Sequence, residues 1–375
     1  MRDRKHILIA TLAGMLLLTA ASAWGQIVHG QPAAAGTRVI YDHWTLKVPG
    51  ASNDLSQFMI PLSGFVPLAE NLEARFFISE VANSVTEANA DYSLSGLTDA
   101  RLQISQALAN DRLLVSLGLN LPTGKKGLDT LKESRVAEYL SYNFLTLPIR
   151  RLGEGLGINL LLGAAGSSGD TRYGATVTYQ MAGAYEAYQN KGDYNPGDLL
   201  NLTASVDISR AKLRYVGDAT VSTFTTDKLD DRKVFRQSAL FDLHVGAMYD
   251  GPSMDVAGDA RYLIRGRNTT YDTTAAETIR DQLKIYGNEL FLSGSLFWSH
   301  SAIWHAGPTL EWRYIGINEY DFGASQTVGL GAEYGRTLGA SIQASVGLKY
   351  YTGSADDGRY DLSGYQMTLG LSSTF

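Results

Sequence analysis

Two segments of the chain carry side chains whose spacing would suit acid–base or nucleophilic chemistry. Asp242 and His244 lie two residues apart, and His305 follows in a later segment. A histidine that pairs with an aspartate beside a serine is the arrangement that hydrolyses acyl bonds. Residues two apart on a strand point to the same side, so a solvated polar face also places these side chains together. We interpret them as polar residues of a lumen, with a hydrolase as the alternative.

Other catalytic and cofactor patterns fail on their spacing. Five residues separate Gly118 from Gly124, where a phosphate-binding loop has four, and Lys126 stands where that loop needs Ser or Thr. No G-x-S-x-G or H-E-x-x-H sequence occurs, cysteine is absent, and the six histidines lack the spacing of metal ligands. The sequence therefore predicts no enzyme activity, no cofactor and no metal site.

Charged residues of both signs alternate along several predicted strands. Charged rings inside a pore can set its ion selectivity. The alternative is that cross-strand pairs fill and stiffen a narrow lumen, and the mixture of signs predicts no strong preference for either charge. The candidate lumen-lining residues are Asp255, Asp259, Arg261, Arg265, Arg214, Glu311, Arg313 and His244.

The elements that position these residues have the period of β-strands. In the segment 302–314, Trp304, Leu310 and Trp312 share one face, whereas Glu311 and Arg313 share the other. The predicted strands are long enough to cross a bilayer at a tilt, and short turns alternate with longer polar connections. We predict an all-β fold: a transmembrane, antiparallel, up-and-down β-barrel of 14–16 strands. The count depends on residues 24–66, which form either a strand pair (38–48 and 56–66) or a plug in the lumen.

Composition and both termini agree with this class of protein. The chain of 375 residues has 39 glycines, 21 tyrosines and only 19% charged residues. Residues 1–23 resemble a signal peptide with cleavage after Ala23, which leaves 24–375 as an outer-membrane barrel. The final strand ends at Phe375, as do strands that the outer-membrane assembly machinery recognises. We therefore expect the lipid bilayer and this machinery as partners, and the net charge of −6 excludes nucleic acid as the main partner.

One connection, residues 122–154, is too long for a turn and contains a helical pattern. Its apolar residues repeat at the spacing of one helix face, and Pro148 ends the pattern. Such a helix in a long outer loop either folds into the mouth and constricts the pore or lies on the rim. The candidate constriction residues are Val136, Tyr139, Leu140 and Phe144.

Three short segments resemble motifs of the phenol meta-pathway degradation family of outer-membrane proteins. They are L-G-L-N-L-P-T-G (117–124), P-I-R-R-L-G-E-G (148–155) and D-Y-N-P-G-D (193–198). That family is regarded as related to porin-like channels for hydrophobic compounds, including transporters of long-chain fatty acids and aromatic hydrocarbons. The resemblance implies a barrel that takes up small hydrophobic or aromatic solutes. This chain lacks the extended apolar plug of the fatty-acid channels.

Three functions are consistent with these features. The first is a passive channel for small hydrophobic or aromatic solutes. The second is a structural or surface-interaction barrel with a closed lumen, in which the outer loops carry the function. The third is an outer-membrane hydrolase, which would need a serine beside His244 or His305.

Overall fold

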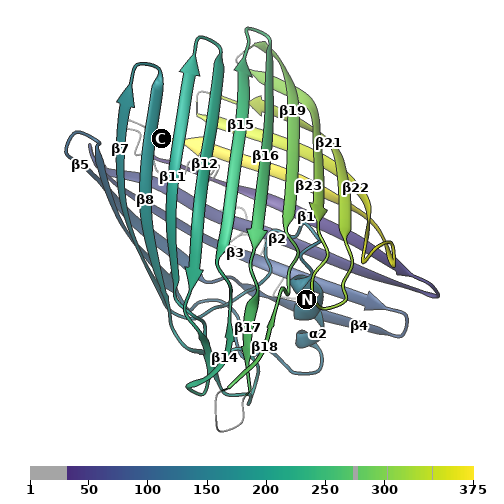
Figure 1. Ribbon diagram of the computed structural model, residues 1–375. Coiled ribbons are helices and arrows are strands. Elements are labelled where there is room, and N and C mark those ends of the chain that lie inside the picture. Colours follow the sequence, from purple (N-terminus) through teal and green to yellow (C-terminus); the bar gives the residue numbers. More distant parts are fainter. Residues whose placement is uncertain (1–31, 273–277, 302, 340) are drawn as a thin grey trace, which may run out of the picture.

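The computed structural model describes residues 32–272, 278–301, 303–339 and 341–375, so the predicted signal peptide (1–23) lies outside the described residues. In this part of the chain, sixteen antiparallel strands form a closed barrel (Figure 1). The wall strands are β1 (Ala34–Val48), β2 (Ala51–Ala69), β3 (Leu72–Glu87), β5 (Ala100–Leu108), β6 (Leu113–Leu121), β7 (Gly157–Ser168), β8 (Thr171–Ala182), β11 (Leu199–Arg210), β12 (Leu213–Phe224), β15 (Leu240–Asp250), β16 (Met254–Arg265), β19 (Glu289–Ser301), β20 (Trp304–Ile315), β21 (Ser325–Thr337), β22 (Ile342–Ala355) and β23 (Tyr360–Thr374).

The first and last wall strands close the ring. β1 pairs with β23 from Ala34 opposite Thr374 to Lys47 opposite Asp361, and β1 pairs with β2 on its other side. Every wall strand therefore has a neighbour on both sides, which leaves no open edge. The predicted barrel class is confirmed, and the strand count is sixteen because residues 34–69 form two strands of the wall.

The side chains of the wall alternate between an apolar outer face and a polar inner face. On β22, Val346, Leu348 and Tyr350 are exposed outward, whereas Lys349 and Tyr351 point to the interior and contact other strands there. The apolar positions of neighbouring strands stand opposite one another, as in the rows Leu310–Leu330–Tyr350 and Val346–Leu369. The outer surface is therefore a belt of exposed apolar side chains.

The two ends of the barrel differ in their connections. One end of the barrel contains the first and the last residue of the wall strands, Ala34 and Thr374. The connections at this end are short, such as 169–170 and 211–212. We call this the turn end. At the opposite end, which we call the loop end, the connections 122–156, 183–198, 225–239 and 266–288 are long.

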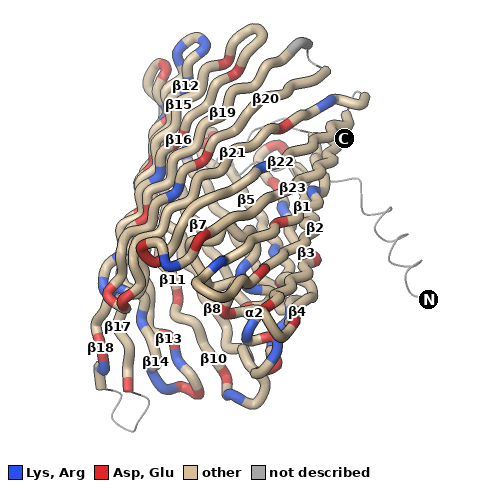
Figure 2. Tube along the Cα trace, turned by 90° about the vertical axis from the view of Figure 1, so that its right-hand side faces the viewer, with Lys and Arg blue, Asp and Glu red and all other residues tan. Residues whose placement is uncertain are grey.

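A second sheet extends from the barrel at the loop end. Its strands are β9 (Tyr185–Glu186), β10 (Asp193–Asn195), β13 (Asp227–Leu229), β14 (Arg232–Arg236), β17 (Asn268–Tyr271) and β18 (Ile279–Leu283). Acidic and basic positions gather in this extension (Figure 2). The sequence predicts polar loops here, because strands that are polar on both faces lack an apolar period-two pattern. The segment 81–95, which the sequence predicts to be a polar connection, is instead a hairpin of β3 with β4 (Ala90–Leu97).

The long connection 122–156 contains the helix α2 (Glu133–Ser141), shorter than the apolar pattern indicates. Among the described residues, no helix is long and apolar enough to cross a membrane. α2 and the residues after it pack into an apolar cluster at the loop end, inside the barrel. This cluster joins the inner faces of β1, β2, β3 and β22 to the loop and includes Trp44, Leu46, Leu55, Val81, Val85, Leu94, Ile315 and Leu362.

Candidate functional site: a loop across the barrel mouth

The base of the connection 122–156 is held by one buried carboxylate. Asp99, which is 5% exposed, accepts hydrogen bonds from the backbone N–H of Gly124 (2.8 Å) and of Glu154 (2.6 Å) and from the side chain of Asn120 (3.0 Å). A Cβ atom on Gly124 would lie 2.1 Å from the carbonyl oxygen of Leu152, so only glycine fits there. Two of the segments that resemble family motifs, 117–124 and 148–155, thus meet at this carboxylate.

Helix α2 is attached to the β3–β4 hairpin. Val136, Tyr139 and Leu140 are at most 2% exposed and belong to the apolar cluster. Arg135 and Tyr139 both bind the carboxylate of Glu87, at 2.6 Å and 2.9 Å. Burial, followed by the hydrogen bond to Glu87, raises the pKa of the Tyr139 hydroxyl, which keeps it a neutral donor. One face of the helix is therefore fixed to the wall.

The segment after α2 extends over the interior of the barrel. Phe144 stacks on Phe322 of the connection after β20, with ring centroids 5.6 Å apart. Further along, Gln57 on β2 binds both backbone groups of Ile149: its Nε2 donates to the carbonyl oxygen (2.6 Å) and its Oε1 accepts from the N–H (3.1 Å). Gln57 is fully buried. The loop is thereby fastened to the inner face of β2.

Arg150 follows directly and carries a charge into the lumen. Its Nη2 donates to the carbonyl oxygens of Asn143 (3.3 Å) and Leu145 (2.9 Å), which fix the guanidinium. Among the described residues, no carboxylate forms an ion pair with it. Burial lowers the pKa of Arg150, and the positive charge of Arg313 lowers it further, whereas Glu289 raises it. Arg313 and Glu289 belong to the part of the barrel wall that faces the loop, which we call the facing wall.

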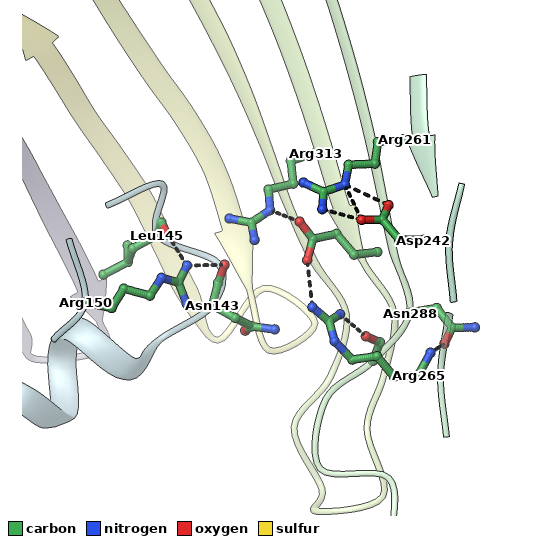
Figure 3. Close-up of polar contacts among 10 residues, drawn as sticks. Asn143, Leu145, Arg150, Asp242, Arg261, Arg265, Asn288 and Arg313 are labelled. Atoms are coloured by element: carbon green, nitrogen blue, oxygen red, sulfur yellow. Dashed lines mark hydrogen bonds and ion pairs between the residues drawn. The ribbon is translucent and has the colours of Figure 1, made fainter. Parts of the chain in front are cut away.

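That facing wall holds an acidic residue between two arginines (Figure 3). Glu289 on β19 accepts from Arg313 Nε on β20 at 2.7 Å and lies 3.3 Å from Arg265 Nη2 on β16. Arg265 also donates to the carbonyl oxygen of Gly287 (2.8 Å), and all three charged side chains are less than 20% exposed. Going around the ring from β19 to β2, five strands lie on one side and nine on the other. The loop contacts β2, and its Arg150 lies close enough to Glu289 on β19 and Arg313 on β20 to be influenced by their charges. The loop therefore bridges much of the mouth.

Below this level, further charged pairs line the inner face toward the turn end. Arg261 binds Asp242 (2.8 Å), and the two ring nitrogens of His244 lie 2.9 Å from Asp218 and 3.1 Å from Asp259. Lys349 binds Glu311 on another part of the wall. Nearest the turn end, Arg214 binds Asp207 (2.7 Å).

The turn end contains a cavity of about 630 Å³. Asp255 and His305 line it together with two basic residues, Arg38 and Arg336. The ring of His305 packs edge-on against Phe297. Asp255 also accepts a long hydrogen bond from Ser299 (3.4 Å). The predicted lumen residues are thus spread over several levels of the barrel, and only Arg265 and Arg313 lie beside the loop.

A histidine next to a serine, which the hydrolase alternative needs, occurs on β1 and β2. His43 Nδ1 lies 3.4 Å from Ser56 Oγ, and its Nε2 lies 3.9 Å from Asp54. These distances exceed those of an activated serine, for which about 2.6–3.2 Å is usual. His244 is instead flanked by carboxylates, as described above.

The sequence missed four of the residues that build the mouth. Asp99, Gln57, Glu289 and Arg150 acquire their roles from contacts between distant segments; Gln57 and Ile149, for example, are 92 residues apart. The four candidate constriction residues, Val136, Tyr139, Leu140 and Phe144, are at most 3% exposed. They hold the loop against the wall, whereas Arg150 lies close enough to the facing wall for Arg313 and Glu289 to influence its charge. A constriction by this loop stays a prediction.

Comparisons with known proteins add little beyond the fold. No protein-family model and no curated protein matches the chain, so membership in the phenol meta-pathway family stays a prediction. Solved structures that match include OprB of Pseudomonas putida (10% identity, 92% of this chain, 93% of that chain, TM-score 0.45) and OprD of Pseudomonas aeruginosa (8%, 95%, 100%, 0.44). The outer membrane channel DcaP of Acinetobacter baumannii also matches (8%, 90%, 97%, 0.42). At these TM-scores, function has to be argued from the barrel itself.

Proposed function

We propose that the protein is a passive channel in the outer membrane of a bacterial-type cell envelope, with the loop end facing outward. The observation that carries the proposal is the apolar belt on a closed wall. Exposed apolar patches of this extent mark contact with another apolar phase, and a bilayer is the phase that surrounds a barrel on all sides. A strand of twelve residues, such as β11, is roughly 40 Å long at about 3.3 Å per residue, enough to cross a tilted bilayer path.

The inner face supports a water-filled lumen. The ion pairs of His244, Arg261 and Arg214 lie on it, and their charged groups require water or one another as partners. Passage in this proposal involves no covalent step, no cofactor and no catalytic residue. The side chains along the wall and the loop across the mouth determine which solutes pass.

Small hydrophobic or aromatic solutes remain part of the proposal. Tyr286 and Tyr320 present rings at the loop end that are 43% and 51% exposed. Rings so placed offer apolar contact at the entrance. The charged pairs below them favour solutes that also carry a polar group, because a purely apolar molecule displaces water from these charges without replacing its hydrogen bonds.

Reconstitution of the mature chain tests the proposal. We expect liposomes that contain the folded protein to swell in an isosmotic pentose solution, and planar bilayers to show stepwise conductance in KCl. Liposomes without protein and liposomes with heat-unfolded protein are the controls. No gain of permeability over these controls, in either assay, would exclude the channel.

The closed-lumen barrel is the second candidate, and one observation favours it. The six-stranded extension and the apolar cluster form a substantial structure at the loop end that a simple pore does not require. A surface-interaction protein would show no conductance but would expose this extension on intact cells. Labelling of a cysteine introduced at Asp230, in the turn between β13 and β14, tests this exposure, and the absence of conductance separates this candidate from the channel.

A further inference from the structure

We infer that the mouth of the barrel is an anion-binding site, in which Arg150, Arg265 and Arg313 select small aromatic carboxylates. The inference rests on the proposed channel function and adds the charge and chemical class of the solute. It depends on where three guanidinium groups and one carboxylate lie, and on an exposed ring beside them.

The charge balance of the site is positive. Glu289 is shared by Arg265 and Arg313, so one carboxylate faces two guanidinium groups. Arg150 adds a third positive charge whose described hydrogen-bond partners are neutral carbonyl groups. The next pair, Arg261 with Asp242, contributes no net charge. Within this group of four side chains, three positive charges against one negative charge leave a net charge of +2.

The position of Arg150 makes this charge available to a solute. Its guanidinium is held at the loop by two backbone carbonyl groups, and Arg265 and Arg313 lie on the facing wall (Figure 3). A solute that passes between loop and wall meets donors from both sides. Arginine is well suited to a carboxylate because its N–H groups match both oxygens. Fixed side chains also avoid the loss of rotamer freedom on binding.

An aromatic ring next to these donors narrows the class of anion. Tyr286, in the connection before β19, packs under the Arg265 guanidinium at 5.9 Å, and its ring is 43% exposed. The ring therefore lies beside one of the arginines of the facing wall. A carboxylate attached to a ring therefore meets a guanidinium and an apolar surface at once.

Planar bilayers that contain the mature protein test the inference in two measurements. The first is the reversal potential in a KCl gradient, which gives the permeability ratio of chloride to potassium. The second is the reduction of chloride current by benzoate, with acetate as the carboxylate that lacks a ring. We expect chloride to be preferred over potassium, and benzoate to block at lower concentration than acetate.

Single substitutions then assign these effects to residues. Arg150→Gln should lower the chloride preference about fivefold and weaken the block by both carboxylates. Arg151→Gln is the matched control, because Arg151 is 62% exposed and pairs with Glu154. Glu289→Gln should raise the chloride preference, and Tyr286→Leu should weaken the block by benzoate but not by acetate. Each variant is first checked for the heat-dependent gel migration of a folded barrel.

Each outcome decides one part of the argument. If wild-type protein gives no conductance, the channel function itself fails. Conductance without anion preference, or an anion preference that both Arg150→Gln and Glu289→Gln leave unchanged, would overturn the anion site while the channel stands. An anion preference with equal block by benzoate and acetate removes the role of Tyr286 and with it the aromatic class.

Discussion

At the scale of single residues, the mouth depends on polar groups that receive their partners from distant parts of the chain. Asp99 lies between β4 and β5, yet its carboxylate binds both ends of the loop 122–156. Gln57 supplies a donor to the carbonyl oxygen and an acceptor to the N–H of one loop residue, Ile149. A buried group with such partners is costly to replace, because the groups left behind lose their hydrogen bonds. These two residues therefore offer sharp tests of how the loop is held.

Asp99→Ala should release the base of the loop without opening the barrel. Hydrogen bonds to a charged group contribute about 1.5–3 kcal/mol each, so loss of the bonds from Gly124, Glu154 and Asn120 should lower the local stability of the loop by about 3 kcal/mol or more. Trypsin should then cut the folded protein within the loop at least about ten times faster, since local opening limits proteolysis. Asp170→Ala, at a turn where the side chain is 66% exposed, is the control. Equal cleavage in both variants would contradict the role of Asp99.

Gln57→Met should loosen the loop from β2. The change keeps the length of the side chain but removes the partner of the N–H and carbonyl of Ile149 and of the side-chain oxygen of Asn83, at a cost of about 1–3 kcal/mol for each group. If the protein conducts, the single-channel conductance should rise and its fluctuations increase, because the loop leaves the mouth for part of the time. Gln103→Met, where the side chain on β5 binds only Ser105, is the control. An unchanged current trace would show that the loop does not move with this contact.

At the scale of elements, the barrel wall and the loop are separable. The wall is held by backbone ladders between neighbouring strands, none of which involves residues 127–150. The loop comes back close to its own start, since a Cβ atom on Gly153 would lie 2.7 Å from the carbonyl oxygen of Lys125. A short linker can therefore replace the loop without straining β6 or β7.

Replacing residues 127–150 with Gly-Ser-Gly should give a folded barrel with a wider mouth. Conductance should increase several-fold, and the anion preference should fall because Arg150 is removed. The thermal midpoint should also fall, since Trp44 and Leu55 lose their cover and each large apolar side chain contributes about 1.5–3 kcal/mol through burial. Thermal unfolding followed by circular dichroism, together with bilayer conductance, measures both effects. Unchanged conductance in a folded variant would mean that the loop does not constrict the pore.

The sequence predicts elements well where alternation is imposed by lipid on one side and water on the other. The strands around Trp304–Tyr314 and 342–350 follow from that pattern alone. The extension at the loop end does not, because β13 and β14 are only three and five residues long and carry charged residues on both faces, although Asp230 and Asp231 with positive φ mark the turn between them. The mouth is not predictable from local pattern either. Arg150 and Glu289 are 139 positions apart in the chain, and only the fold brings their charges close enough to influence one another.

At the scale of the whole molecule, the barrel is defined by its last strand. β23 pairs with β22 on one side and with β1 on the other, so the ring forms only when the C-terminal strand is in place. An open barrel would leave two unpaired strand edges in the membrane, where no water can satisfy them. Closure by β23 is therefore a condition for a barrel without open edges.

A substitution at the C-terminal Phe375 separates assembly in the outer membrane from the thermal stability of the folded barrel. Its backbone N–H donates to the carbonyl oxygen of Ala33 (2.7 Å), but its side chain is 65% exposed. Phe375→Ser keeps the backbone bond and removes the ring, so the variant should refold in detergent with an unchanged thermal midpoint. We propose that the assembly machinery binds this ring, and we expect several-fold less variant than wild type in outer-membrane fractions at equal synthesis. Phe241→Ser, an outward-facing position on β15 away from the C-terminal strand, controls for the loss of an exposed aromatic side chain. Equal amounts of Phe375→Ser and wild type in the membrane would show that the terminal ring is not what the machinery binds.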